Sequence, residues 1–342
     1  MAWRASVPDV LILGAGVAGL ACAGALAQAG ARVTVLDKGR GVGGRVATRR
    51  VDGQPVDHGV AFFHGSDRAF LQALEATPAT RLDGWPARVR GAGLPCNPAA
   101  WDRAARRLAY AEGASAFPKA LAAGLDVRTG VRVSGLSPRD GGLNLTDDAG
   151  QTWHAPTLVL ALPLEQARAL LAPVVAFTPA TALLGAVETR PCWTVIARYD
   201  GLDDPLDAEL YLPEDSPVLQ VISHDSSKRP PPRQRVLVLQ ARAAWSQAHL
   251  EAPEAEVSAA LLAEAARVLG PWAGAPAGIQ AHRWRYARVQ GGDSFGAPYL
   301  QTLPSGARLG LIGETFDRAG GVEGAFRAGR RLARHLSGAP HA

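Results

Sequence analysis

Residues 10–45 read VLILGAGVAGLACAGALAQAGARVTVLDKGRGVGGR, and this stretch decides the fold. The apolar run Val10–Leu13 is typical of a fully buried strand. A glycine-rich turn follows, and then an alanine- and leucine-rich stretch to Ala29 whose composition favours a helix. Residues 32–36 predict a second strand, which leaves Asp37 at its end. A strand, a turn, a helix, a strand and an acid in this order predict a Rossmann-like dinucleotide-binding unit.

Each glycine of the turn has a separate physical role. Gly14 permits the tight turn, Gly16 lets peptide N–H groups approach a pyrophosphate, and Gly19 lets the helix pack close to the sheet. The helix N-terminus adds partial positive charge beside the phosphates. Asp37 lies 18 residues after Gly19, near the usual spacing for an acid that accepts hydrogen bonds from ribose hydroxyls. An acid at this place disfavours a 2′-phosphate.

The same stretch admits one alternative, a membrane-targeting segment. Residues 10–27 carry no charge over 18 positions, and Arg4 precedes them, so their length is compatible with a membrane span or a signal peptide. Four glycines within this run argue against a stable helix, and a second strand follows at once. We therefore expect a dinucleotide-binding unit and no association with a membrane.

Length and composition indicate a globular protein with two domains, or with one domain that carries a large insertion. The chain has 342 residues, 47% hydrophobic and 20% charged, and a formal net charge of +5. Its basic residues form no dense block, so nucleic acid is not an expected partner. The three cysteines, Cys22, Cys96 and Cys192, lie far apart and are odd in number, which fits a reducing, cytoplasmic compartment. The eight histidines show no metal-ligand spacing, so no metal site is predicted.

A second glycine motif lies directly after Asp37. Residues 38–48 read KGRGVGGRVAT, where Gly43 and Gly44 would let the backbone approach the phosphates from another side. Arg45 could place a forked cation on them. The alternative is a flexible surface loop with a solvated arginine. Because a bound dinucleotide continues beyond the ribose-binding acid, the position of the motif favours cofactor binding.

Together, GAGVAG, Asp37 and RGVGGRVAT resemble the flavoprotein superfamily of amine oxidases, phytoene desaturases and renalases. More locally, the chain resembles the bacterial renalase-like branch in DKGRGVGGRVATRR, in Asp57-His58-Gly59, in residues 115–133, in AHRWRYA at 281–287 and in GVEGAF at 321–326. The resemblance implies non-covalently bound FAD and a small-molecule substrate. It further implies hydride transfer from an isomeric dihydronicotinamide dinucleotide to the flavin, with oxygen as the electron acceptor.

The resemblance also implies an architecture. We expect an α/β fold with a Rossmann-like FAD-binding domain built from residues 1–78, 115–163 and 298–342. A mixed α+β substrate domain would be built from residues 79–114 and 164–297.

The resemblance implies cofactor contacts along the whole chain. The backbone of Val133 would meet adenine, Glu314 would contact the flavin ribitol, and the helix near Val322 would direct its N-terminus at the flavin ring, where its dipole stabilises negative charge. No catalytic side chain is predicted. The predicted cofactor-binding residues are Gly14, Gly16, Ala18, Gly19, Asp37, Lys38, Gly44, Arg45, Ala61, Phe62, Val133, Glu314 and Val322.

One departure from the family bears on the substrate. Relatives have Gly-Ala-Gln-Tyr where this chain has Gly59-Val60-Ala61-Phe62, so Ala61 and Phe62 replace a polar amide and a phenol. The resemblance puts this stretch near the flavin, and the change predicts a more apolar site that oxidises ordinary renalase substrates slowly. His64 could restore a polar group, although a loop histidine without a catalytic part is the favoured interpretation.

Three other functions stay open. An amine oxidase typically has a lysine that holds a water near the flavin, and none of Lys38, Lys119 and Lys228 lies at a clearly matching place. A pocket with paired aromatic side chains would favour that function, but Trp85 and Trp101 are expected to pack against the core. A carotenoid-type desaturase would need an apolar tunnel and membrane contact. The third alternative is an FAD-binding protein without turnover.

Three local patterns add expectations. Residues 226–235, SSKRPPPRQR, predict a solvated and mobile loop. Residues 126–136 predict one strand. In residues 282–286, HRWRY, strand alternation puts Trp284 on one face and the two arginines on the other. These arginines would either bind a substrate phosphate or carboxylate, or lie at a surface edge.

Overall fold

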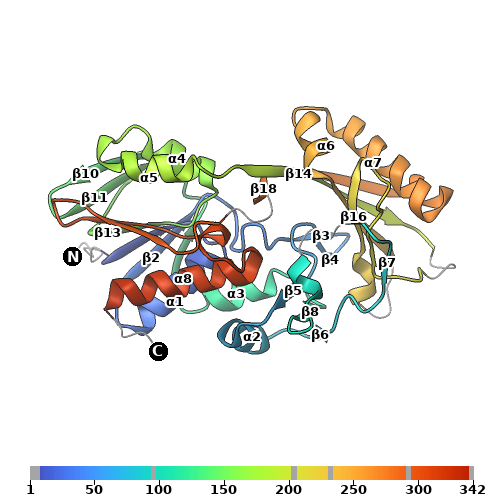
Figure 1. Cartoon of the computed structure of the whole chain (residues 1–342), viewed down its shortest axis with the longest axis horizontal. Helices are drawn as coiled ribbons and strands as arrows, with labels where there is room; N and C mark the ends of the chain where they lie inside the picture. The colour runs from blue at the N-terminus through green and yellow to red at the C-terminus, as the bar shows by residue number, and fades with distance from the viewer. Residues whose placement is uncertain (1–7, 94–97, 202–205, 230–233, 290–293, 339–342) are drawn as a thin grey trace. The chain divides into compact units, whose positions relative to one another are not determined.

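The strand predicted at the start of the chain lies at the centre of a parallel sheet in the computed structural model (Figure 1). β1 (Val10–Leu13) pairs in parallel with β2 (Val33–Asp37) on one side and with β13 (Thr157–Leu160) on the other. All four residues of β1 are buried. Because both faces of this strand are covered, its sequence is a continuous apolar run rather than an alternating one.

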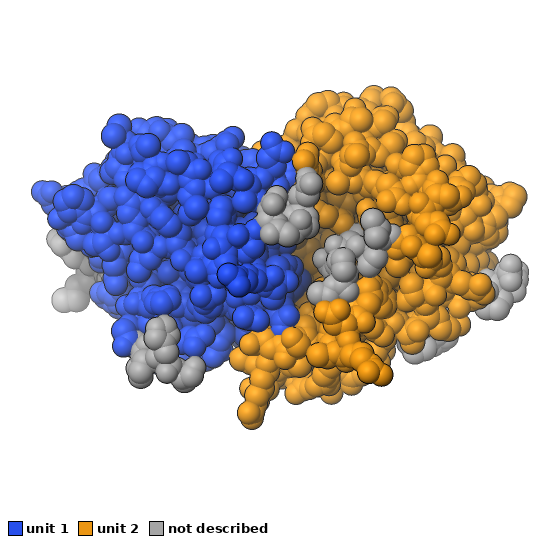
Figure 2. Space-filling view, in the orientation of Figure 1, with its two compact units in different colours: residues 1–44, 117–189, 289–342 blue, residues 45–116, 190–288 orange. Residues whose placement is uncertain are grey.

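The structure describes residues 8–93, 98–201, 206–229, 234–289 and 294–338. These residues divide into two compact units, which Figure 2 colours separately. Unit 1 comprises residues 1–44, 117–189 and 289–342, and unit 2 comprises residues 45–116 and 190–288. The predicted boundaries of an FAD-binding domain and a substrate domain stay a prediction.

The sheet of unit 1 has six strands in the order β19-β20-β13-β1-β2-β9. β9 (Asp126–Thr129) and β20 (Arg308–Leu311) continue the parallel arrangement, and β19 (Tyr299–Thr302) is an antiparallel edge strand. The carboxyl ends of the parallel strands therefore lie along one edge of the sheet, which is where open α/β sheets bind their ligands.

Helices α1 (Val17–Gln28) and α8 (Gly321–Ser337) pack together on one face of this sheet (Figure 1). A side chain at Gly329 would place its Cβ 2.3 Å from the carbonyl oxygen of Ala18, so the two helices approach at backbone distance. β10 (Val133–Arg139), β11 (Gly142–Asp147) and β12 (Thr152–Ala155) form an antiparallel sheet on the other face. The same side carries α4 (Leu164–Leu171) and α5 (Thr178–Leu184). Helix α3 (Ala116–Ala122) comes directly before β9 in the chain.

The single strand expected at residues 126–136 is instead two strands, which belong to two different sheets. Residues 126–136 were expected to be continuous, but β9 ends at Thr129 and β10 begins at Val133. Gly130 between them has a φ of +74°, a backbone conformation that glycine adopts at no steric cost. The turn sends the chain out of the parallel sheet and into the antiparallel one.

Unit 2 is built on a second sheet, in the order β18-β14-β17-β16-β15-β7. The bounds are β18 (Gly278–Val289), β14 (Thr189–Tyr199), β17 (Arg235–Ala241), β16 (Leu219–His224), β15 (Leu210–Tyr211) and β7 (Val89–Arg90). Helix α7 (Glu254–Leu269) packs against β16 and β17 through Val257, Leu261 and Ala265. These positions are four residues apart and therefore share one helix face.

Smaller elements complete unit 2. β3 (Thr48–Val51) and β4 (Gln54–Asp57) form a hairpin, and β5 (Phe63–Gly65), β8 (Arg106–Tyr110) and β6 (Arg81–Asp83) form a three-stranded sheet. The remaining α-helices are α2 (Arg68–Glu75) and α6 (Ala243–Ala248). The predicted α/β class, with a Rossmann-like unit beside mixed α and β structure, is confirmed. None of the described helices combines the length and the apolar character that a membrane span needs.

The expectation of a solvated, mobile loop at residues 226–235 is wrong for the part that the structure describes. Asp225–Lys228 form a short 3₁₀ helix, and Ser226, Lys228 and Arg235 are all buried. Residues 230–233, which include the prolines, lie outside the described residues. Proline and arginine content indicates solvation only on average, and here buried carboxylates compensate the lysine.

Two histidines, the buried His58 and the half-buried His224, make the stability of the protein depend on pH. Burial lowers the pKa of His58 to about 4, with a further contribution from the positive charge of Arg49. Burial and the charge of Arg235 likewise lower the pKa of His224 to about 4. Both rings are therefore neutral in the folded protein well below pH 6.5, the ordinary value for histidine, whereas the unfolded chain binds protons there.

We predict that the free energy of unfolding falls as the pH is lowered from about 6.5 towards 4. A depressed histidine pKa contributes stability above the unfolded pKa that is lost on acidification, by about 1.4 kcal/mol per pH unit for each histidine. Urea unfolding at about pH 7 and about pH 5 measures the fall. His224→Gln should reduce it, and the matched change His335→Gln on the exposed end of α8 should not. An equal fall in all three proteins would contradict the assignment.

Candidate functional site

Packing alone requires two glycines of the turn between β1 and α1. Gly14 has a φ of +108°, and a Cβ there would lie 2.4 Å from the carbonyl oxygen of Ala161. A Cβ on Gly19 would lie 2.0 Å from the carbonyl oxygen of Gly14 and 3.2 Å from the Cβ of Ala161. Both residues let the turn and the start of α1 close against the chain that leaves β13.

Packing does not explain Gly16. A Cβ on this residue would meet no atom within 4 Å, so the protein itself leaves the space in front of it open. Gly16 is the N-cap of α1 and supplies no side-chain cap to the free N–H groups of the first turn. Unused donors, a helix dipole and open space fit the approach of an anionic group such as a pyrophosphate. Ala18 is buried in the first turn of the helix.

The structure brings the second glycine motif against the first. The N–H of Gly43 donates to the carbonyl oxygen of Ala15 at 2.8 Å, and Gly43 forms a β-bridge with Gly16. Gly44 has a φ of +55°, and a Cβ there would lie 3.7 Å from the Cα of Gly16. Residues 43 and 44 are thus part of the same backbone cradle as the turn after β1.

Asp37 lies at the carboxyl end of β2 and braces this cradle. Its Oδ2 accepts a hydrogen bond from the N–H of Ala15 at 2.6 Å, and its Oδ1 accepts one from the N–H of Gly39 at 2.6 Å. Each carboxylate oxygen can accept a second bond, so ribose hydroxyls can still bind.

The next residue, Lys38, instead points towards α4, where its Nζ donates to Gln166 at 3.0 Å. Burial lowers the pKa of Lys38, and the charge of Arg132 adds to the effect.

Of the other predicted residues of unit 1, Glu314 and Val322 lie on elements that pack together, since a Cβ on Gly324 of α8 would lie 3.4 Å from the carbonyl oxygen of Glu314. Glu314 follows β20 in a short 3₁₀ helix, so it lies at the carboxyl edge of the sheet, as the turn at Gly14 does. Val322 is the second residue of α8, whose N-terminus carries no side-chain cap. Val133 opens β10 and pairs with Asp147 of β11.

Arg45, Ala61 and Phe62 belong to unit 2. The Nη1 of Arg45 donates to the carbonyl oxygen of Ala287 at 3.0 Å. Ala61 and Phe62 lie half-buried in the segment between β4 and β5. The ring of Phe62 packs against Trp85 and Trp101, with centroids 6.0 and 6.1 Å away. Trp85 is buried in this cluster, as expected, rather than facing a pocket.

The cluster around Lys228 was missed. Lys228 is fully buried, and its Nζ donates to Asp57 Oδ2 and Asp225 Oδ1 at 2.8 Å each and to the carbonyl oxygen of Ala61 at 2.6 Å. Arg229 Nη1 donates to Asp225 Oδ2 at 2.6 Å. Burial opposes ionisation of Asp225, but these two cations hold its pKa below its usual range. Asp57 and Lys228 are 171 residues apart in sequence, so no spacing rule could have paired them.

Strand alternation at residues 282–286 is confirmed. Trp284 Nε1 donates to the carbonyl oxygen of His58 at 3.1 Å. Arg283 and Arg285 lie on the other face, where both donate to Glu251, at 2.6 and 2.5 Å. Their side chains are more than a third exposed, so of the two roles considered for them the surface edge is the one observed.

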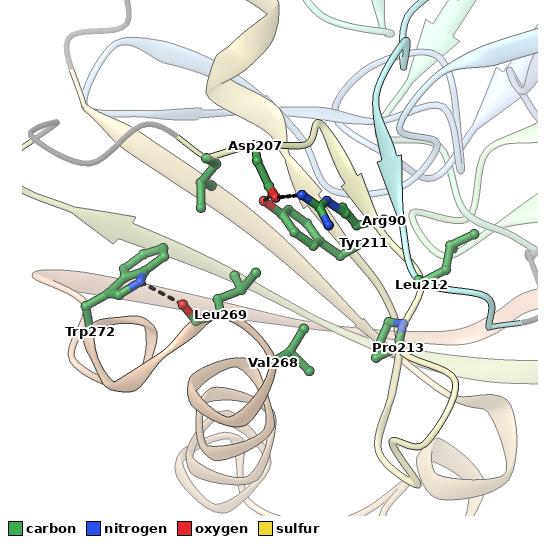
Figure 3. A pocket seen from close by; sticks show the side chains of 10 residues that line it. Arg90, Asp207, Tyr211, Leu212, Pro213, Val268, Leu269 and Trp272 are labelled. Carbon is green, nitrogen blue, oxygen red and sulfur yellow. Dashed lines mark hydrogen bonds and ion pairs between the residues drawn. The ribbon is translucent and has the colours of Figure 1, made fainter.

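A pocket of about 540 Å³ lies elsewhere in unit 2, beside the edge strand β7 (Figure 3). Val268, Leu269 and Trp272 line one side, and an ion pair between Arg90 and Asp207 lies on the other. None of the predicted cofactor-binding residues lines it. The described residues also contain no group of three or more His, Cys, Asp or Glu side chains able to hold a metal ion.

Comparisons with known proteins give the family. Residues 12–75 match a model of the NAD(P)-binding Rossmann-like domain, and residues 100–337 match the model of flavin-containing amine oxidoreductases. The chain is 46% identical over 61 residues to polyamine oxidase 4 of Oryza sativa subsp. japonica and 43% identical over 58 residues to probable polyamine oxidase 4 of Arabidopsis thaliana. Each match covers 12% of the relative and at most 18% of this chain.

Solved structures with the same fold match over almost the whole chain. A putative protoporphyrinogen oxidase from Exiguobacterium sp. 255-15 has a TM-score of 0.75 at 14% identity, and cyclohexylamine oxidase from Brevibacterium oxydans IH-35A has a TM-score of 0.73 at 15% identity. Each alignment covers 97% of this chain and 99% of the other. Because the second family model spans more than half of the sequence, the chain belongs to the family of flavin-containing amine oxidoreductases, which makes it an oxidoreductase with non-covalently bound FAD.

Proposed function

We propose that this protein oxidises isomeric dihydronicotinamide dinucleotides with oxygen as the electron acceptor, as renalase-like proteins do. Overall, the substrate gives up a hydride, and dioxygen takes the hydride and a proton to become hydrogen peroxide. FAD supplies the hydride acceptor, so the chain itself has to bind, orient and exclude water. The sequence resemblance to the renalase-like branch, which extends from Asp37 to GVEGAF, supports this assignment.

The cradle of unit 1 would hold the dinucleotide part of FAD. Open space at Gly16 and the uncapped N-terminus of α1 suit the pyrophosphate, and Asp37 would accept hydrogen bonds from ribose. Glu314 would contact the ribitol, Val133 would meet adenine, and the N-terminus of α8 at Val322 would point at the flavin ring. In unit 2, Arg45, Ala61 and Phe62 would contact the cofactor.

The observation that carries the substrate choice is the bonding of Lys228. A lysine that holds a water near a flavin needs an N–H free to donate to that water. An ammonium has three protons, and Lys228 donates to Asp57, Asp225 and Ala61. A fourth donor does not exist, so the one fully buried lysine among the described residues is committed to protein acceptors. This arrangement favours a dinucleotide substrate over an amine.

An amine oxidase is the second candidate, and the comparisons favour it. The curated relatives are named polyamine oxidases, and two of the similar structures are titled cyclohexylamine oxidase and putrescine oxidase. These relatives share only a short stretch or a fold with this chain. Of the two tryptophans that could line an amine site, Trp85 is buried against Phe62 and Lys228.

We predict that Gly16→Val abolishes FAD binding without destabilising the fold. Its side chain would occupy the open space that the protein leaves for the phosphates, so affinity for FAD should fall at least about a hundredfold. The measurement is FAD titration into apoprotein, with urea unfolding of each variant. Gly24→Val is the matched control, since a Cβ on Gly24 also meets no atom within 4 Å but lies further along α1. Equal FAD affinity in the two variants would count against the cradle.

We predict that a dihydronicotinamide isomer bleaches the bound flavin and that amines do not. Anaerobic stopped-flow mixing with reduced nicotinamide isomers, polyamines and cyclohexylamine measures the loss of flavin absorbance. Hydrogen peroxide should form in equal amount with the oxidised substrate once oxygen is admitted. Rapid bleaching by an amine alone would establish the second candidate, and no bleaching by any reductant would indicate a protein that binds FAD without turnover.

We predict that the double change Ala61→Gln with Phe62→Tyr raises the rate of flavin reduction by the renalase substrates. A lost polar contact costs about 1–3 kcal/mol, which is about one to two decades in rate if the contact acts in the transition state. Because the ring of Phe62 packs among tryptophans, most of the gain should come from Ala61→Gln alone. If both variants leave slow reduction unchanged, these two residues are not its cause.

A further inference from the structure

The segment between β4 and β5 is held by side chains from distant strands. Residues 58–62 form neither helix nor strand. Trp284 Nε1 of β18 donates to the carbonyl oxygen of His58 at 3.1 Å, and Gln240 Nε2 of β17 donates to that of Gly59 at 2.8 Å. An irregular segment usually leaves its carbonyls to water. Here the sheet of unit 2 fixes the direction of successive peptide planes.

Lys228 holds the last carbonyl of this segment. Its Nζ donates to the oxygen of Ala61 at 2.6 Å, while Asp57 and Asp225 bind the same ammonium from the other directions at 2.8 Å each. The ring of Trp85 lies 4.5 Å from the Nζ. Lys228 and both carboxylates are buried, so moving the ammonium would break an ion pair away from water, and the carbonyl of Ala61 has a rigid partner.

The peptide plane converts this contact into a direction for the next N–H. In a trans peptide the C=O of one residue and the N–H of the following residue point in opposite directions. Lys228 fixes the C=O of Ala61, and it therefore aims the N–H of Phe62 away from the buried cluster. Within the described part of the chain, no protein acceptor receives a hydrogen bond from this N–H.

The pattern differs at the neighbouring peptide, which is already satisfied on both sides. The C=O of Gly59 binds Gln240, and the N–H of Val60 donates to the carbonyl oxygen of Arg45 at 3.2 Å. Of these two peptide planes, the one that Lys228 holds combines a charged partner on the carbonyl with an N–H that has no acceptor among the described residues. A positive charge on the carbonyl also polarises the peptide, and this strengthens its N–H as a donor.

We propose that Lys228 is a positioning residue, which aims the N–H of Phe62 at an acceptor atom of bound FAD. The inference rests on the proposed contact of Ala61 and Phe62 with the cofactor. It assigns Lys228 no contact with FAD or with substrate, because its three protons are already bound.

Residue-resolved amide hydrogen exchange in the apoprotein and the FAD complex is the first measurement. In the apoprotein the N–H of Phe62 has no acceptor among the described residues and should exchange readily. FAD should slow its exchange by about tenfold or more. This measurement needs no substitution, so it tests the contact even if every variant at Lys228 fails to fold. Unchanged exchange at Phe62 on FAD binding would overturn the inference.

The second measurement uses a charge-balanced variant, Lys228→Met with Asp225→Asn. It removes one cation and one anion together and leaves Asp57 beside Arg229, whose Nη2 lies 3.8 Å away. Without the ammonium the peptide of Ala61 can turn, so FAD should no longer protect the N–H of Phe62, and its dissociation constant should rise about tenfold. Lys119→Met, the same change on an exposed lysine of α3, should behave as wild type.

Each outcome separates the inference from the proposed function. Folded variant protein that keeps both FAD affinity and protection of Phe62 would show that Lys228 has no positioning role. Loss of affinity with protection retained would also contradict it, because that result indicates general destabilisation. Protein in which FAD protects Phe62 through Lys228, but which no dihydronicotinamide bleaches, would refute the proposed substrate and leave the positioning role in place.

Discussion

The close approach of the turn after β1 to the chain that leaves β13 is the constraint on which unit 1 depends. At Gly14 and Gly19 a single extra carbon would come within 2.0–2.4 Å of a carbonyl oxygen, far inside any tolerable contact. This packing sets α1 against the sheet and turns its uncapped N–H groups towards the sheet's carboxyl edge. Asp37 joins the same cradle through its carboxylate, and Gly43 joins it through a backbone hydrogen bond that brings Gly44 beside Gly16. One steric requirement therefore orders several chemically distinct parts.

Unit 2 depends on a different kind of interaction, a compensated group of buried charges. Lys228, Asp57 and Asp225 are buried, and the partly exposed Arg229 pairs with Asp225. Removing one member would leave a partner charged and unpaired inside the protein, which is costly, whereas the complete set restrains every segment that contributes to it. The segment after Asp57 is thereby held by side chains rather than by strand pairing, and the N–H of Phe62 has no acceptor among the described residues.

The glycine cradle of unit 1 and the buried charges of unit 2 bear on two different questions. The cradle relates to the cofactor, and the buried charges relate to the substrate. A glycine cradle with an acid at the end of β2 suits the binding of FAD, and the match to the model of flavin-containing amine oxidoreductases agrees with this. The choice between a dihydronicotinamide and an amine turns on polar groups in a few short segments. There the resemblance implies that Ala61 and Phe62 replace a polar pair, and the buried Lys228 has no donor left for a water.

The sequence by itself determined the features that are local or periodic. Apolar runs predicted β1 and β13, helix composition and a strand-turn-helix spacing predicted α1 and the turn, and alternation predicted the two faces of HRWRY, because each signal lies within a few residues. Only the tertiary structure decided that Gly16 faces open space, that Gly130 sends residues 126–136 into two sheets, and that Lys228 is buried. Lys228 meets Asp57 across 171 residues. Such pairings depend on how separate strands pack. Nothing in the local sequence of residues 226–235 indicates that Lys228 will meet buried carboxylates.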